Sequence, residues 1–335
     1  MMHLPARIIG TGSLLPGRAY ETAEVVAALG RDDTAGRYER KSGIYRRHWA
    51  ESGTLMAPLA ADAIGAALEM AGMAATELSR IIMVRSVAGD LMFPATANRV
   101  AAALGLSGSC DCFDLNNACM GFLTAMDLAA RCVATGMGPV AIVASEMGSR
   151  FIRQSEHRPY LVFGDAMAAA IIGRAGPQEG IEASYFGNDG TLPNDVFAED
   201  PSLTGQREYI QFAKSSTEIF DIAFRAMAAG IEGVLARAGV CMGDVDWVLP
   251  HQPNGAMLDL MVERLGVDPA RTVRVVQDVG SVGAASIALS LDRLLRSRAV
   301  RPGQRILLAG VGGGVSYGAV LYRVGDIAEK VEGMP

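Results

Sequence analysis

Short apolar runs alternate with longer stretches of helical periodicity along this chain. Residues 78–84 and 245–249 are apolar runs of strand length, and each predicts a buried strand. Residues 122–130 place strong helix formers at helical spacing and predict a helix that closely follows a strand. Strands that alternate with helices in this way indicate an α/β fold, with largely parallel sheets buried on both faces.

The pattern occurs twice. Residues 71–82 align without a gap with residues 238–249, because in each segment an Ala-Gly pair follows a helix and a spacer of equal length leads into a strand. Such self-similarity is typical of a duplicated α/β unit. We therefore expect an N-terminal half over residues 1–173 and a C-terminal half over residues 174–335.

Cys119 stands at the junction between a strand and the helix predicted over residues 122–130. The positive end of a helix dipole favours the nucleophilic thiolate over the thiol. This position therefore suits a cysteine that carries an acyl group covalently. A buried cysteine with a purely structural role is the alternative interpretation.

Turns from both halves are expected to meet near Cys119, since ligands of such sheets gather at the carboxyl ends of the strands. His251 directly follows the end of an apolar strand, and the turn that corresponds to Cys119 in the second half contains Ser281. Three glycines at 312–314 follow the last long strand, where a bare backbone N–H can face an oxyanion. Cys119 and His251 together suggest a nucleophile with a base or hydrogen-bond donor, whereas a core histidine and a tight turn are the alternatives.

Composition narrows the classes of function. The chain has 335 residues, of which 50% are hydrophobic, and can bury a large core in one or two domains. A net charge of −6 argues against general nucleic-acid binding. The five cysteines lack framework spacing, and Cys110 and Cys112 have no second ligand pair beside them. With no apolar stretch typical of a signal peptide or membrane span, we expect a cytoplasmic protein without a metal site.

Basic side chains gather in one segment, at Arg37, Arg40, Lys41, Arg46 and Arg47. One interpretation is a solvated loop. The other is a docking point for a phosphate-bearing ligand or an acidic carrier protein.

Over essentially its whole length the chain resembles the β-ketoacyl-acyl-carrier-protein synthase III family of thiolase-superfamily condensing enzymes. The resemblance rests on landmarks in the family's order, namely Ile8-Ile9-Gly10-Thr11-Gly12, Ser42-Gly43-Ile44, Asn117-Ala118-Cys119-Met120-Gly121-Phe122, Phe163-Gly164-Asp165-Ala166, Gly187-Asn188-Asp189-Gly190, His251-Gln252-Pro253-Asn254 and Gly312-Gly313-Gly314. It implies a five-layered α-β-α-β-α fold of duplicated halves and a homodimer. It also implies an acyltransferase-class ketosynthase of fatty-acid or polyketide biosynthesis. Such an enzyme uses acyl-coenzyme A or acyl-carrier-protein thioesters and no tightly bound cofactor.

The resemblance also implies residue roles. Cys119 would take the acyl group, with the N–H groups of Cys119 and Gly314 as its oxyanion hole, and His251 would stabilise the enolate left when a malonyl thioester loses carbon dioxide. Phe93 would reach across the dimer into the partner's acyl pocket. The other expected substrate-binding residues are Arg37, Lys41, Phe163, Phe220 and Asn254.

Ser281 stands where the family has a second enolate-stabilising residue, an asparagine. A serine hydroxyl donates one hydrogen bond but reaches less far than an amide, unless an ordered water bridges the gap. Loss of one such donor typically costs about 3 kcal/mol, or roughly a hundredfold in rate. Decarboxylation is therefore expected to be weakened, whereas acyl transfer from Cys119 does not need this donor.

Further departures concern the thioester donor. Ala256 stands where an arginine is common, and Asp259 and Glu263 follow on the same helix, so an acidic carrier protein should dock more weakly. Arg37 occupies the place of an adenine-stacking tryptophan and Lys41 that of an arginine, so contacts to coenzyme A should differ. These departures favour a specialised relative over the housekeeping enzyme.

Three functions remain open. The first is a ketosynthase that joins a Cys119-bound acyl group to a malonyl or β-ketoacyl thioester. The second is an acyltransferase that passes the acyl group to an oxygen, nitrogen or sulfur acceptor without decarboxylation. The third is a catalytically silent subunit of a heterodimer.

Overall fold

The computed structural model of the chain describes residues 3–32, 36–176, 178–192, 195–297 and 300–325. The strands are β1 (Ala6–Leu14), β2 (Arg18–Glu21), β3 (Arg46–Trp49), β4 (Arg80–Val84), β5 (Asp111–Leu115), β6 (Val140–Met147), β7 (Asp165–Arg174), β8 (Gly180–Asn188), β9 (Val196–Phe197), β10 (Gln211–Phe212), β11 (Trp247–Pro250), β12 (Arg305–Gly312) and β13 (Ser316–Arg323). The α-helices are α1 (Thr22–Ala28), α2 (Arg37–Ser42), α3 (Met56–Ala71), α4 (Thr96–Ala103), α5 (Gly121–Ala134), α6 (His157–Val162), α7 (Pro201–Thr204), α8 (Ser216–Ala238), α9 (Gly255–Arg264), α10 (Val276–Val279) and α11 (Ala285–Arg296). Short 3₁₀ helices include η1 (Ala75–Glu77), η2 (Ala118–Met120), η4 (Met242–Asp244) and η6 (Gly313–Val315).

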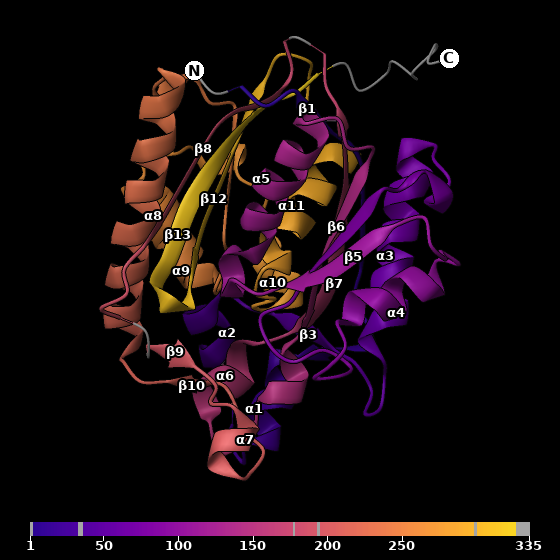
Figure 1. Cartoon of the computed structure of the whole chain (residues 1–335). Coiled ribbons are helices and arrows are strands. Elements are labelled where there is room, and N and C mark those ends of the chain that lie inside the picture. Colours follow the sequence, from indigo (N-terminus) through magenta and orange to yellow (C-terminus); the bar gives the residue numbers. More distant parts are fainter. Residues whose placement is uncertain (1–2, 33–35, 177, 193–194, 298–299, 326–335) are drawn as a thin grey trace.

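Five layers follow one another across the molecule (Figure 1). Helices α3 and α4 cover the outer face of the sheet β1-β7-β6-β4-β5, and α8 and α9 cover the outer face of the sheet β11-β12-β13-β8. Helices α5 and α11 lie between the two sheets, where Leu123 and Ile287 belong to a buried cluster that draws on both halves. The predicted five-layered α/β fold is therefore confirmed.

The two sheets repeat one topology. The order β1-β7-β6-β4 in the first sheet corresponds to β8-β13-β12-β11 in the second, with the same pattern of parallel and antiparallel pairs. The first sheet carries β5 as an additional edge strand. The chain passes from one sheet to the other between Arg174, where β7 ends, and Gly180, where β8 begins.

The sequence repeat has a local physical cause. Gly72 and Gly239 close α3 and α8 in the left-handed region, with φ of 67° and 69°, and the next residue's N–H reaches back to a carbonyl five residues earlier. This is the glycine-terminated cap that lets a helix end abruptly. In η1 and η4 the carboxylates of Glu77 and Asp244 then accept a backbone N–H three residues earlier. The two matched segments therefore encode the same turn from helix to strand.

Both sheets are mixed, so the expectation of largely parallel sheets was wrong. β4 pairs in parallel with β5 and β6, and β11 with β12, but β7 and β13 run antiparallel to both of their neighbours. Only the short η6 joins β12 to β13, and so short a connection permits only an antiparallel return. Apolar runs report the burial of a strand but not its direction.

A cap of short elements closes one end of the layered body. α1, α2, α6, β9 and β10 gather there in Figure 1, below the ends of the sheets. None of the helices in the described ranges is both long and apolar enough to cross a membrane.

Arg47 holds this cap in place and does not belong to an exposed docking cluster, in contrast to one interpretation of the sequence. Its side chain is fully buried, and its guanidinium donates to Thr22 Oγ1 at 2.9 Å and to the Leu161 carbonyl at 2.7 Å. Burial lowers the pKa of Arg47 to about 10. The neighbouring Arg46 is exposed and forms an ion pair with Asp278 at 3.1 Å.

We expect Arg47→Met to lower the free energy of unfolding by about 3 kcal/mol, because Thr22 and Leu161 lose a buried charged donor. Arg46→Met is the matched control, and loss of its exposed ion pair should cost less than about 1 kcal/mol. Urea unfolding of both variants measures the difference. Equal costs would contradict the structural role of Arg47.

Candidate active site

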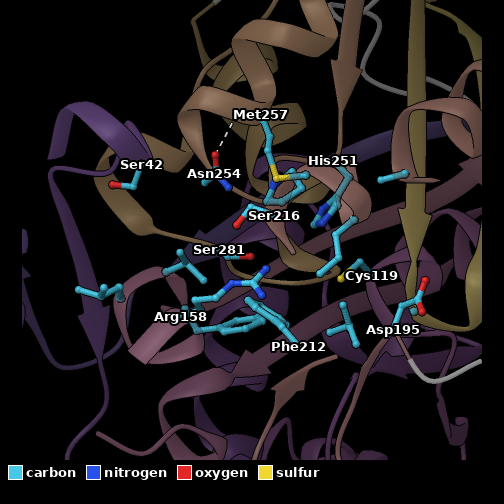
Figure 2. Close-up of a pocket in the computed structure, with 18 of the residues that line it drawn as sticks. Ser42, Cys119, Arg158, Asp195, Phe212, Ser216, His251, Asn254, Met257 and Ser281 are labelled. Atoms are coloured by element: carbon cyan, nitrogen blue, oxygen red, sulfur yellow. Dashed lines mark hydrogen bonds between the residues drawn. The ribbon is translucent and has the colours of Figure 1, made fainter. Parts of the chain in front are cut away.

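Cys119 lies in η2, between the end of β5 and the start of α5. Ala118 before it has a φ of 44°, and the Met120 N–H donates to the Asn117 carbonyl at 3.0 Å, so the backbone turns sharply at this point. The strand-to-helix junction predicted for Cys119 is confirmed. Its side chain is partly exposed and lines a cavity (Figure 2).

The expectation that the helix end favours a thiolate at Cys119 was wrong. Burial raises the pKa of the thiol to about 12, with a further contribution from the negative charge of Glu146, while a backbone hydrogen bond acts in the opposite direction. Desolvation at Cys119 therefore acts against the effect expected from the end of the helix. The resting cysteine is a neutral thiol and needs a base to become a nucleophile.

His251 continues β11 toward the cavity, and its N–H donates to the Ala309 carbonyl of β12 at 2.8 Å. The side chain is 4% exposed, and Nδ1 lies 2.8 Å from Ser286 Oγ. Burial lowers the pKa of the imidazole to about 4, so it is neutral at physiological pH. Gln252 beside it is buried and accepts the N–H groups of Val275 and Val276 through Oε1, which fixes the turn.

Ser281 belongs to the C-terminal half and lines the cavity, where backbone hydrogen bonds to the N-terminal half hold it in place. Its N–H donates to the Val162 carbonyl at 2.7 Å, and its carbonyl accepts from the Gly164 N–H at 2.9 Å. These bonds pair Ser281 with Phe163, which lines the same cavity. The side chain of Ser281 is 5% exposed.

The end of β12 packs against the turn that carries Cys119. A Cβ atom on Gly312 would lie 3.1 Å from the Cys119 nitrogen and 3.2 Å from the Met120 nitrogen. Only glycine permits this approach without a shift of the backbone. The end of β12 from the second half therefore meets the backbone of the turn that carries Cys119 in the first half.

The cavity has a volume of about 520 Å³ and brings together Cys119, His251 and Ser281 (Figure 2). Lys41, Phe163 and Asn254 also line it, as expected for substrate-binding residues. Asn254 has a second role, because its Oδ1 accepts the Met257 N–H at 2.9 Å and caps α9.

Four expected site residues lie elsewhere. Arg37 is exposed, because Tyr38 and Lys41 form the face of α2 that lines the cavity. Phe220 is buried in the core and stacks with Phe224 at 6.0 Å, so it does not line the cavity. Gly312 and Gly313 line the cavity, but Gly314 does not. Phe93 is 88% exposed on the surface, and its role in a dimer stays a prediction.

Glu146 is a site residue that sequence reasoning missed. It is the penultimate residue of β6, a strand that is buried along its whole length, and a charged residue in such a strand is the signal that could have found it. It accepts the Ser86 hydroxyl at 2.6 Å and the Ala284 N–H at 3.2 Å, and burial raises its pKa to about 7. Arg31, Arg158, Asp195 and Phe212 were also missed, and all four come from the cap. In the described ranges no cluster of three or more His, Cys, Asp or Glu side chains is arranged to hold a metal ion.

Comparisons with known proteins agree with this geometry. Residues 113–190 match the family described as 3-oxoacyl-[acyl-carrier-protein (ACP)] synthase III, and residues 235–324 match its C-terminal domain. The chain is 33% identical over 323 residues to the beta-ketoacyl-[acyl-carrier-protein] synthase III of Hyphomonas neptunium, covering 95% of this chain and 98% of that protein.

Solved structures show the same likeness. The 3-oxoacyl-[acyl-carrier-protein] synthase III of Aquifex aeolicus VF5 superposes with a TM-score of 0.87 at 29% identity, covering 95% of this chain and 100% of that one. The priming beta-ketosynthase of the R1128 polyketide biosynthetic pathway superposes with a TM-score of 0.86 at 30% identity, covering 97% of both chains. The chain belongs to the β-ketoacyl-acyl-carrier-protein synthase III family. It is a condensing enzyme of this kind. The relatives do not favour the two alternatives, a silent subunit and an acyltransferase without decarboxylation.

The electrostatics of the site predict a pH-dependent difference between the wild type and Glu146→Gln. The variant removes a charge that opposes the thiolate, so Cys119 should react roughly threefold to tenfold faster with iodoacetamide at pH 8. Because the pKa of Glu146 is about 7, the wild-type carboxyl is largely protonated at pH 6, and there the difference should shrink. Peptide mass spectrometry of Cys119 measures both rates.

Glu156→Gln is the control and should leave the rates unchanged, because Glu156 forms an exposed ion pair with Arg153 and does not line the cavity. A slower reaction in Glu146→Gln at pH 8 would show that Glu146 assists thiolate formation instead of opposing it.

Proposed function

We propose that Cys119 accepts an acyl group from a thioester and that the enzyme joins this group to the α-carbon of a malonyl or β-ketoacyl thioester. The observation that carries the proposal is the convergence of Cys119, His251 and the glycine-lined end of β12 on one cavity. Each comes from a different strand end, and together they provide a nucleophile, a neutral base and bare backbone donors.

In the first step the Cys119 sulfur attacks the carbonyl carbon of the thioester. A carbon–sulfur bond to Cys119 forms, and the bond to the donor's sulfur breaks. The thiol proton passes to the ring nitrogen of His251 that does not face Ser286, and from there to the departing thiolate. The imidazole is neutral, so this ring nitrogen has a lone pair that can accept the proton.

The tetrahedral intermediate needs donors for its oxyanion. We assign this role to the N–H groups of Cys119 and Gly313, in place of the expected Gly314, because Gly313 lines the cavity. Preorganised backbone donors of this type require no reorganisation during the reaction.

In the second step a malonyl thioester loses carbon dioxide, and the electron pair of the broken bond forms an enolate. The enolate carbon attacks the acyl carbonyl, the bond to Cys119 breaks, and the sulfur leaves as a thiolate that takes up a proton from solvent water. With a β-ketoacyl thioester, His251 would remove the α-proton instead. The Ser286 hydroxyl can either accept from or donate to Nδ1, so it supports His251 both as base and as donor. Ser281 is the second donor to the enolate oxygen.

The thioesters are acyl-coenzyme A or acyl-carrier-protein conjugates, with Lys41 at the exposed mouth of the cavity to meet a phosphate. Arg264 of α9 forms an ion pair with Asp221 at 3.3 Å and lies over the Phe220 ring. Because these contacts already occupy its charge, we expect an acidic carrier protein to bind only weakly to this helix. We further propose a cytoplasmic homodimer with Phe93 at its interface, halves over residues 1–173 and 174–335, and a role in fatty-acid or polyketide biosynthesis.

Cys119→Ala tests the nucleophile. We expect it to abolish covalent acylation by an acyl-coenzyme A, seen as a mass increase on the Cys119 peptide, and to abolish product formation. Cys241→Ala, at an exposed cysteine away from the cavity, is the control and should retain both. Full product formation by Cys119→Ala would overturn the mechanism.

Ser281→Asn tests the second step. An amide reaches further than a hydroxyl and restores a donor worth about 3 kcal/mol, so release of labelled carbon dioxide from a malonyl thioester should rise up to roughly a hundredfold. Acylation of Cys119 should stay unchanged, because it does not use this group. No gain in release would mean that Ser281 serves a different acceptor.

A further inference from the structure

Arg158 is a cation inside the cavity that the mechanism above does not use. It belongs to α6 in the cap, and its guanidinium lies over the Phe212 ring, 4.9 Å from the centroid. Its Nη1 donates to the Lys214 carbonyl at 2.5 Å. In Figure 2 the guanidinium extends into the cavity, toward the space between Ser281 and Cys119.

Within the described ranges, no carboxylate forms an ion pair with this cation. Among the described lining residues Asp195 is the only acid, and its carboxylate forms an ion pair with Lys214 at 3.0 Å. Burial alone lowers the pKa of Arg158, with no compensating charge. A guanidinium has five N–H donors, so most of those on Arg158 remain for a ligand after the bond to Lys214.

The depth of Arg158 separates it from the cations that can meet a phosphate. Arg31 and Lys41 line the cavity at its exposed mouth, whereas Arg158 is half-buried. The Phe212 ring beneath Arg158 lies 6.1 Å from the ring of Phe163. The backbone of Phe163 pairs with Ser281, so Arg158 lies on the side of the cavity that contains Ser281. When a pantetheine thioester has its carbonyl at Cys119, its phosphate lies at the far end of a neutral arm, toward the mouth. A negative charge near Arg158 must then come from the acyl portion.

We propose that Arg158 binds the free carboxylate of the malonyl-type thioester and thereby selects a carboxylate-bearing second substrate. This inference rests on the proposed function. The guanidinium suits a carboxylate because the two planar groups can form paired hydrogen bonds. An ion pair to the intact carboxylate stabilises the bound ground state and weakens as carbon dioxide leaves, so loss of Arg158 should raise KM without lowering kcat.

Unreactive ligands test the binding step separately from the chemistry. N-(2-acetamidoethyl)malonamic acid is an amide analogue of a malonyl thioester without a phosphate, and its methyl ester differs only in lacking the carboxylate. Pantetheine 4′-phosphate presents the phosphate without the carboxylate. The dissociation constant of each follows from its protection of Cys119 against iodoacetamide, measured by peptide mass spectrometry in the wild type, Arg158→Gln and Arg158→Lys.

We expect Arg158→Gln to weaken the malonamic acid roughly tenfold and to leave the methyl ester and pantetheine 4′-phosphate within about twofold. Arg158→Lys should retain part of the affinity, since it keeps the charge but loses the paired geometry. Arg153→Gln is the matched control, because Arg153 precedes α6, forms an exposed ion pair with Glu156 and does not line the cavity. The unchanged methyl ester shows that the variant retains a folded cavity.

Two results would overturn the proposal. If Arg158→Gln weakens pantetheine 4′-phosphate and not the malonamic acid, the arginine binds the phosphate of the carrier arm. If all three ligands bind as in the wild type, Arg158 has no part in recognising an anion. A different result would contradict the proposed function itself, namely the absence of an acyl adduct on Cys119 in the wild type.

Discussion

The approach of Gly312 to the amide of Cys119 is the contact on which the active site depends. The β12 strand of the second half lies against the η2 turn of the first half at a position without a Cβ, which would stand 3.1 Å from the Cys119 nitrogen and would force a small shift of the backbone. At Gly310, two residues earlier, a Cβ would lie 2.6 Å from the sulfur of the Met120 side chain. This packing brings the bare backbone of β12 to the nucleophile and holds both halves around one cavity.

A second constraint acts through charge. Glu146 ties the Ser86 loop of the first half to the Ala284 turn of the second, and its position beside Cys119 adds to the burial that keeps the thiol protonated. His251 is kept neutral by the same dry surroundings. The site therefore holds a neutral pair at rest, and charge appears only while an acyl group is transferred.

The cap supplies part of the lining of the cavity. Arg47, buried beneath it, bonds α1 and α6 together through Thr22 and Leu161, and α6 in turn places Arg158 above Phe212. The fully buried Arg47 therefore positions the cap, whereas the half-buried Arg158 lines the cavity. Ser281 and Arg158 both line this part of the cavity.

Sequence alone determined the features that depend on short-range chemistry. The alternation of strands and helices, the duplicated turn closed by Gly72 and Gly239, and the strand-end positions of Cys119 and His251 are all local, and the family resemblance linked them. Features that depend on distant segments were decided only by the tertiary structure. These features are the strand directions in the mixed sheets, the burial of Arg47 and the position of Phe220 in the core. Each depends on which distant segments pack against it. The pKa of Cys119 is raised and not lowered for the same reason. Desolvation and the charge of Glu146 come from the folded surroundings, whereas the sequence showed only the helix that begins beside Cys119.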